Sequence, residues 1–143
     1  MENSAKKLNE LIKICNDGKE FYTKGIQEVE SKKLKSLFTI MATAREKAIQ
    51  DLEPFVEGRG YEVESSGTVA GKIRQGYTAM QQVFRDDEKV LIEQLEENED
   101  RTLAAFKDAL NEDLPTNIDH VLSENLATFS QTHDAMRNLK KSL

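Results

Sequence analysis

The sequence predicts an all-α fold, a four-helix bundle in which one long crossover contains a short fifth helix. Four stretches of about 25 residues carry apolar side chains three and four positions apart, the spacing of one helical face. No stretch shows the alternation of a half-buried strand. Short turns join the first stretch to the second and the third to the last, whereas about 30 residues separate the two pairs. A connection of that length can travel along the bundle, so the second and third long helices can run parallel.

Length and composition are those of one soluble domain, which we expect to span 1–143. A chain of 143 residues can bury a core without disulfides or metals. The net charge of -6 argues against nucleic acid or an anionic membrane as a partner, because affinity for phosphate is mostly electrostatic. Cys15 has no second cysteine to pair with, and its apolar stripe predicts a buried, unreactive thiol. No signal-peptide core or membrane span is apparent, so we expect a cytoplasmic protein.

The first two helices are predicted over about 4–30 and 32–57. Gly18 interrupts the stripe of the first helix, where it marks either the close approach of another helix or a tolerated defect. Ser31 is a natural N-cap for the second helix. The apolar stripes comprise Leu8, Leu11, Ile12, Cys15, Tyr22, Ile26 and Val29, followed by Leu34, Leu37, Phe38, Met41, Ala48, Leu52 and Phe55.

The remaining helices are predicted over about 68–84, 87–111 and 115–142. The short helix carries apolar side chains at mostly four-residue steps. Pro115 suits the first turn of the last helix, because an N–H at that position would have no helical partner. Asp86 or Asp87 can cap the start of the helix over 87–111. The apolar residues of the short helix are Val69, Ile73, Tyr77, Met80 and Phe84.

Polar side chains interrupt the apolar stripes near the middle of the long helices. Arg45 and Glu99 each occupy a position where the stripe requires a core residue, and His133 lies near the stripe of the last helix. We predict that these three residues form a structural polar layer across the core. Arg45 and Glu99 would be its ion pair, with the planar guanidinium donating two hydrogen bonds to the carboxylate. A buried charge left unpaired costs several kcal/mol, so each of the two needs the other or water.

Several short motifs together resemble a known family. They are the segments 8–12, 16–18, 21–22, 66–71, 97–100 and 113–115, with Arg45, His133, Asp134 and Arg137. On these motifs the chain resembles the ferritin-like superfamily. It resembles more closely an uncharacterised bacterial family of ferritin-like four-helix-bundle proteins with a domain of unknown function. The resemblance covers nearly the whole chain, and it implies the ferritin-like fold but no established activity.

The sequence departs from the di-iron members of that superfamily. Those proteins supply a Glu from each of two helices and a Glu-x-x-His motif from each of the other two. No Glu-x-x-His occurs here, since Ser130 lies three residues before His133, and Arg45 introduces a cation where a metal site requires anions. We therefore expect no metal, no cofactor and no catalytic residue. The alternative is a weak metal site formed by Glu20, Glu99 and His133.

Two classes of function remain. The first is a non-enzymatic structural or interaction protein that self-associates as a dimer through the outer faces of its bundle. Such a protein could act in a stress response. The second is a ferritin-like protein that binds iron, manganese or zinc. No arrangement of Ser, Cys, His and Asp supports another class of enzyme. The face of the helix over 68–84 is predicted to join the core of its own chain rather than that of a second copy.

Overall fold

The structure, a computed structural model, describes residues 2–64, 72–82, 84 and 87–143. The helices are α1 (Glu2–Glu28), α2 (Lys32–Glu57), α3 (Lys72–Gln81), α4 (Glu88–Leu110) and α5 (Thr116–Lys141). The described residues contain no strand, so the predicted all-α class is confirmed. Within this part of the chain, no helix is both long and apolar enough to cross a bilayer.

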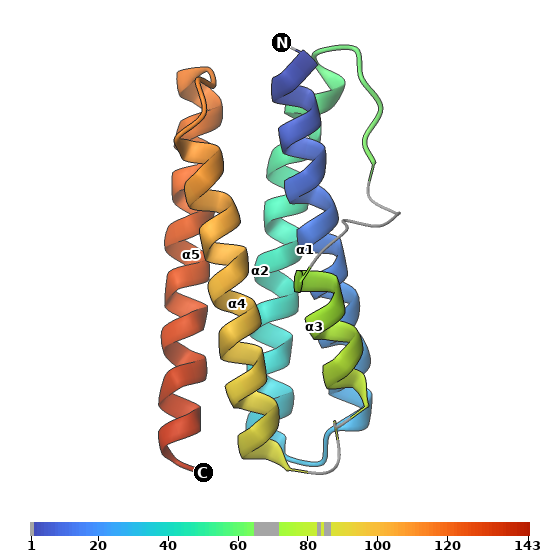
Figure 1. The fold of residues 1–143 in the computed structure, drawn as a ribbon, viewed down its shortest axis with the longest axis vertical. Helices are drawn as coiled ribbons and strands as arrows, with labels where there is room; N and C mark the ends of the chain where they lie inside the picture. The colour runs from blue at the N-terminus through green and yellow to red at the C-terminus, as the bar shows by residue number, and fades with distance from the viewer. Residues whose placement is uncertain (1, 65–71, 83, 85–86) are drawn as a thin grey trace.

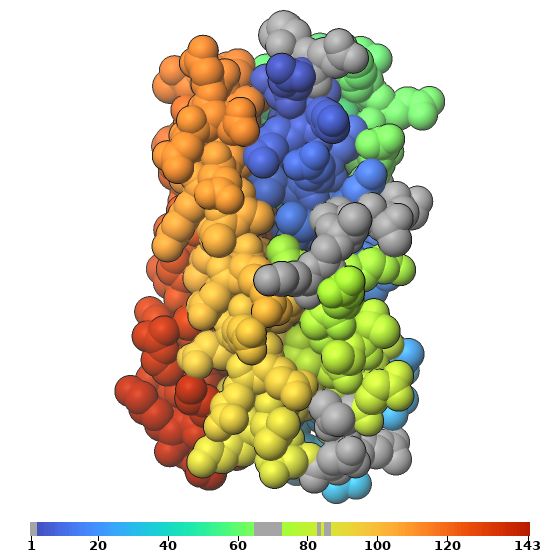
Figure 2. Space-filling model, viewed as in Figure 1, coloured from blue at the N-terminus to red at the C-terminus, as the bar shows by residue number. Residues whose placement is uncertain are grey.

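The four long helices lie side by side along the long axis of the molecule (Figure 1). α1 and α2 run in opposite directions, as do α4 and α5, whereas α2 and α4 run in the same direction. The connection from α2 to α4 therefore travels back along the molecule, and α3 is part of it. α3 packs against both α4 and α1, and Figure 2 shows it filling the space between them on this face.

Side-chain hydrogen bonds cap the starts of α2 and α4. The Ser31 side chain accepts a hydrogen bond from the Leu34 amide at 3.2 Å, and Asp87 accepts from the amides of Lys89 and Val90. Pro115 is the N-cap residue of α5 rather than part of its first turn, because its ψ of 146° is extended.

Other ends differ from the sequence prediction. α1 covers Glu2–Glu28 rather than 4–30, and α3 is described over Lys72–Gln81. The start of the predicted helix over 68–84, residues 68–71, lies outside the described residues.

Two apolar clusters fill the core, one toward each end of the long axis. We call them the upper and lower clusters, after their places in Figure 1. The upper cluster contains Leu8, Leu11, Ile12, Ile14, Cys15, Ala44, Ala48, Ile49, Leu52, Val56, Phe106, Ala109, Ile118, Leu122 and Phe129. The lower cluster contains Phe21, Tyr22, Val29, Leu34, Leu37, Phe38, Met41, Tyr77, Met80, Phe84, Leu91, Ile92, Leu95 and Met136. Polar side chains are buried between them, and α3 contributes Tyr77 and Met80 to the core of its own chain.

Candidate functional site

Arg45 and Glu99 meet where the upper and lower clusters adjoin. Arg45 belongs to α2 and Glu99 to α4, and they are only 1% and 2% exposed. Nη2 of Arg45 lies 2.6 Å from Oε1 and 2.7 Å from Oε2 of Glu99. Hydrogen bonds between ionised groups are short and strong, so each charge here neutralises the other away from water.

The hydrogen bonding of the guanidinium differs from the predicted fork. A single nitrogen, Nη2, donates to both carboxylate oxygens, while Nη1 donates to the backbone carbonyl of Ile14 at 3.3 Å. This carbonyl belongs to α1, so Arg45 joins α2 to α1 as well as to α4. Nη1 does not reach Glu99 because it is bound to the Ile14 carbonyl. The position of that carbonyl is set by the packing of α1 against α2, which the spacing of side chains in the sequence does not reveal.

Two tyrosines complete the hydrogen bonding of Glu99. The hydroxyl of Tyr22 on α1 donates to Oε1, and that of Tyr77 on α3 donates to the same oxygen at 3.2 Å. Tyr77 also accepts a hydrogen bond from Nη2 of Arg45 at 3.2 Å. Burial is the main cause that raises the pKa of both tyrosines above the ordinary value of 10.0. Both hydroxyls therefore remain protonated donors at neutral pH.

Arg45 keeps its charge despite complete burial. Burial by itself favours the neutral form of Arg45, but the Glu99 carboxylate and the neighbouring hydroxyl and thiol groups act together in the opposite direction. As a result, the pKa of Arg45 is raised well above its ordinary value. The guanidinium also lies 5.1 Å from the ring centre of Phe129 and 5.9 Å from that of Tyr22, within the range of cation–π attraction. Thr102 lies 3.4 Å from Nη2.

Gly18 on α1 provides the space that Arg45 occupies. A Cβ atom at position 18 would lie 2.6 Å from Nη1 of Arg45 and 2.9 Å from the hydroxyl oxygen of Tyr77. The sequence leaves two explanations open for this glycine, the close approach of another helix or a tolerated defect. A close approach explains it, but the group that approaches Gly18 is the Arg45 side chain rather than a helix backbone. The Cys15 thiol lies nearby and is fully buried. Burial raises its pKa to about 12, which makes it an unreactive neutral thiol.

α3 is held over this site by polar contacts as well as by Tyr77. The side-chain amide of Asn98 on α4 donates to the backbone carbonyl of Ile73 at 3.0 Å. This approach requires Gly76, because a Cβ atom there would lie 2.5 Å from Oδ1 of Asn98. Arg74 pairs with Asp17 of α1 at 3.1 Å.

His133 forms a separate pair. Its Nε2 lies 2.7 Å from Oδ1 of Asp100 on α4, and the imidazole is buried whereas Asp100 is exposed. Glu99 and Asp100 are consecutive on α4, so their side chains point about 100° apart around the helix axis. One therefore faces the core and the other α5. The three residues predicted to form one layer are thus arranged as the Arg45–Glu99 pair and the His133–Asp100 pair.

The three residues of the alternative metal site are not brought together. Glu20 is exposed and accepts a hydrogen bond from Asn16 at 3.3 Å, Glu99 is bound to Arg45, and His133 is paired with Asp100. Among the residues that the structure describes, no three His, Cys, Asp or Glu side chains lie close enough to hold a metal ion.

Sequence reasoning missed two members of the site, namely Tyr22 and Tyr77. The two tyrosines lie on apolar stripes, where the aromatic ring alone is sufficient to explain the residue. One signal in the sequence could have indicated Tyr22. It lies one helical turn after Gly18, so its side chain is on the helix face where Gly18 leaves space.

The fold and the site together define an all-helical protein with a buried, self-neutralised ion pair. Residues 3–112 match the family model described as a domain of unknown function (DUF2383), and the chain belongs to that family. The match spans most of the chain, including α3 and α4, and ends before α5 begins at Thr116. A search of curated proteins found no match.

Proposed function

We propose that this protein is a non-enzymatic, ferritin-like four-helix-bundle protein with a structural or interaction role. The Arg45–Glu99 pair occupies the midsection of the bundle, where di-iron proteins of the ferritin-like type hold their metals. The observation that carries the proposal is the contact of the Arg45 guanidinium with both carboxylate oxygens of Glu99. The parallel direction of α2 and α4 around a single long crossover supports the ferritin-like part of the proposal (Figure 1).

The chemistry of the site disfavours a metal ion. Oε1 of Glu99 already receives hydrogen bonds from Arg45, Tyr22 and Tyr77, and Oε2 receives one from Arg45. A cation bound to Glu99 would leave the guanidinium of Arg45 buried without its counterion, at a cost of several kcal/mol. The Cys15 thiol, with a pKa of about 12, does not supply a thiolate at neutral pH.

Metal content tests this proposal against the metal-binding alternative. The protein would be expressed in medium supplemented with iron, manganese and zinc, and the metal ions per chain measured by elemental analysis. We expect well below one ion per chain, and a thermal midpoint that a chelator does not change. Stoichiometric metal that disappears in Glu99→Ala or His133→Ala would contradict the proposal and establish the metal-binding function.

The interaction role predicts self-association. Multi-angle light scattering of the purified protein should give the mass of a dimer or a larger assembly. A protein that stays monomeric at high concentration would contradict this part of the proposal, whatever its metal content.

A further inference from the structure

The outer face of α2 is not covered by any other described helix. Its residue Ile40 is 53% exposed, although it lies well inside a long helix. The hydroxyls of Thr39 and Thr43 donate to backbone carbonyls one turn earlier in α2. Lys47 likewise pairs within the helix, with Asp51 at 2.6 Å. The exposed residues in the central part of this face are Ser36, Thr39, Ile40, Thr43, Lys47 and Gln50.

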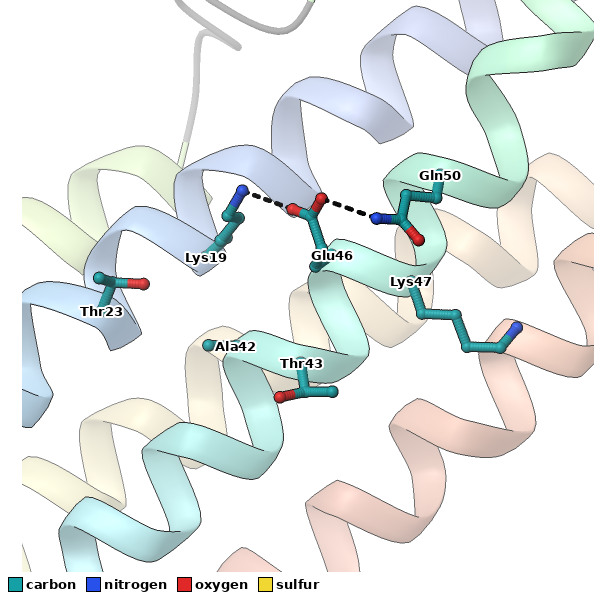
Figure 3. A pocket seen from close by; sticks show the side chains of 7 residues that line it. All are labelled: Lys19, Thr23, Ala42, Thr43, Glu46, Lys47 and Gln50. Atoms are coloured by element: carbon teal, nitrogen blue, oxygen red, sulfur yellow. Dashed lines mark hydrogen bonds and ion pairs between the residues drawn. The ribbon is translucent and has the colours of Figure 1, made fainter.

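A shallow groove lies along the edge of this face, between α2 and α1 (Figure 3). Its volume is about 320 Å³. Short side chains such as Ala42 line it, and Lys19 of α1 pairs with Glu46 of α2 across it. The remaining lining residues are Thr23, Thr43, Lys47 and Gln50. Short side chains allow the backbone of another helix to approach closely.

The charges along α2 are opposite to those that its helix dipole favours. Anions stabilise the N-terminal end of a helix and cations the C-terminal end. The first turn of α2 has no acidic residue and its last turn has no basic residue. Instead, Lys32, Lys33 and Lys35 lie at the start, whereas Asp51, Glu53 and Glu57 lie at the end. At the C-terminal end the guanidinium of Arg59 donates to the backbone carbonyl of Phe55 at 2.9 Å. An acidic group supplied from outside would therefore stabilise chiefly the lysine-bearing start of α2.

We propose that the outer face of α2 binds the same face of a second copy of this chain, antiparallel, about a two-fold axis close to Thr43. Thr43 lies between the basic and the acidic ends of α2. An antiparallel arrangement brings the lysines of each copy to the height of the acidic residues of the other. Ile40 of each copy then packs near the centre of the interface, against the aliphatic part of Lys47 of the other copy.

The charge pattern selects a second copy over an unrelated partner. A two-fold interface uses the same patch twice, so the patch must complement itself when reversed. The charge distribution of α2, basic at its start and acidic at its end, meets this condition. This inference rests on the proposed function, since it names the surface through which the protein self-associates.

Disulfide trapping tests the position of the axis. In Thr43→Cys the two new thiols would face each other across the axis, and mild oxidation should convert most of the protein to a covalent dimer. Cys15 is buried and should not react. Ser123→Cys, on the exposed side of α5, is the matched control and should remain largely uncoupled.

Charge reversal tests the orientation. Lys32→Glu and Glu53→Lys each place a favourable charge near an end of α2, so neither should unfold the monomer. Each single change should raise the dimer dissociation constant about tenfold, because it acts twice in a symmetric dimer. The double variant should return close to the wild-type value. Ile40→Glu, at an exposed position, should yield a folded monomer.

The outcomes separate the two claims. A monomeric wild-type protein would overturn both the self-association in the proposed function and this inference. A wild-type dimer that persists in Ile40→Glu, and in which Thr43→Cys couples no better than Ser123→Cys, would overturn this inference alone. A dimer whose double charge variant is no tighter than either single variant would overturn the antiparallel orientation.

Discussion

Glu99 is a buried carboxylate whose oxygens are both hydrogen-bonded. Arg45 neutralises it, and the hydroxyls of Tyr22 and Tyr77 donate to it from α1 and α3. Burial of a charge is tolerated only when its partners remain charged or protonated themselves. The raised pKa of Arg45 and of both tyrosines meets this requirement.

Gly18→Ala should destabilise the protein. Helix propensity alone would favour alanine by about 1 kcal/mol. The new Cβ, however, would lie 2.6 Å from Nη1 of Arg45, and the buried guanidinium cannot move without losing its partners. We expect a loss of about 1–3 kcal/mol in the free energy of unfolding, measured with urea. A gain in stability would show that the site is less tightly packed than the distances indicate.

The Cys15 thiol should make the stability of the protein depend on alkaline pH. Burial raises its pKa from 9.0 to about 12, so between these values the unfolded chain loses a proton that the folded chain keeps. The free energy of unfolding therefore falls as pH rises from 9 towards 12, by up to about 1.4 kcal/mol per pH unit for this one group. Urea unfolding of the wild type and of Cys15→Ala at several pH values measures this pH dependence. The wild type should lose stability more steeply, and parallel curves would contradict the assignment.

The roles of some site residues can be predicted from the sequence, whereas those of others cannot. Arg45 and Glu99 stand out because a charge on an apolar stripe requires a partner, and the structure places them together. Tyr22 and Tyr77 are not visible in this way, because a tyrosine on such a stripe needs no polar explanation. The partner of His133 depends on the rotation of α4 relative to α5, which residue spacing does not determine. The helix period thus identifies candidates, whereas side-chain partners follow from packing.

Among the elements, α3 depends most on a few specific contacts. It has only ten residues, too few to be stable alone in water. Tyr77 and Met80 anchor it in the lower cluster, and the hydrogen bond from Asn98 to the carbonyl of Ile73 fixes it on α4. The sequence predicts its amphipathic character. Its docking through Gly76 was not predicted, because a glycine inside a helix can equally be a tolerated defect or a site of close contact.

Gly76→Leu should release α3 without unfolding the long helices. The added side chain would displace Asn98, whose Oδ1 would lie 2.5 Å from the new Cβ, and remove the hydrogen bond to Ile73. We expect amide hydrogen exchange across Lys72–Gln81 to accelerate about tenfold or more, with little change in α5. Gln75→Leu, at the exposed neighbouring position, is the control and should leave the exchange unchanged. Equal exchange in Gly76→Leu and the wild type would contradict this account of docking.

The described part of the molecule contains two apolar clusters with charged and polar groups buried between them. Arg45 and Glu99 connect the α1–α2 pair to the α4–α5 pair, since one belongs to each. α5 lies beyond the segment that matches the family model, yet it supplies Phe129, whose ring faces the guanidinium and packs edge-on against Phe106. The midsection is therefore neutralised by the side chains of this chain itself.

A double-mutant cycle on the free energy of unfolding tests this claim most directly. The four proteins are the wild type, Arg45→Met, Glu99→Leu and the double variant. Each single change strands one buried charge and should cost about 3–5 kcal/mol, whereas the double variant replaces the pair by apolar groups and should cost far less than the sum. If the double variant instead loses as much as the two single variants added together, Arg45 and Glu99 do not neutralise each other, and the account is contradicted.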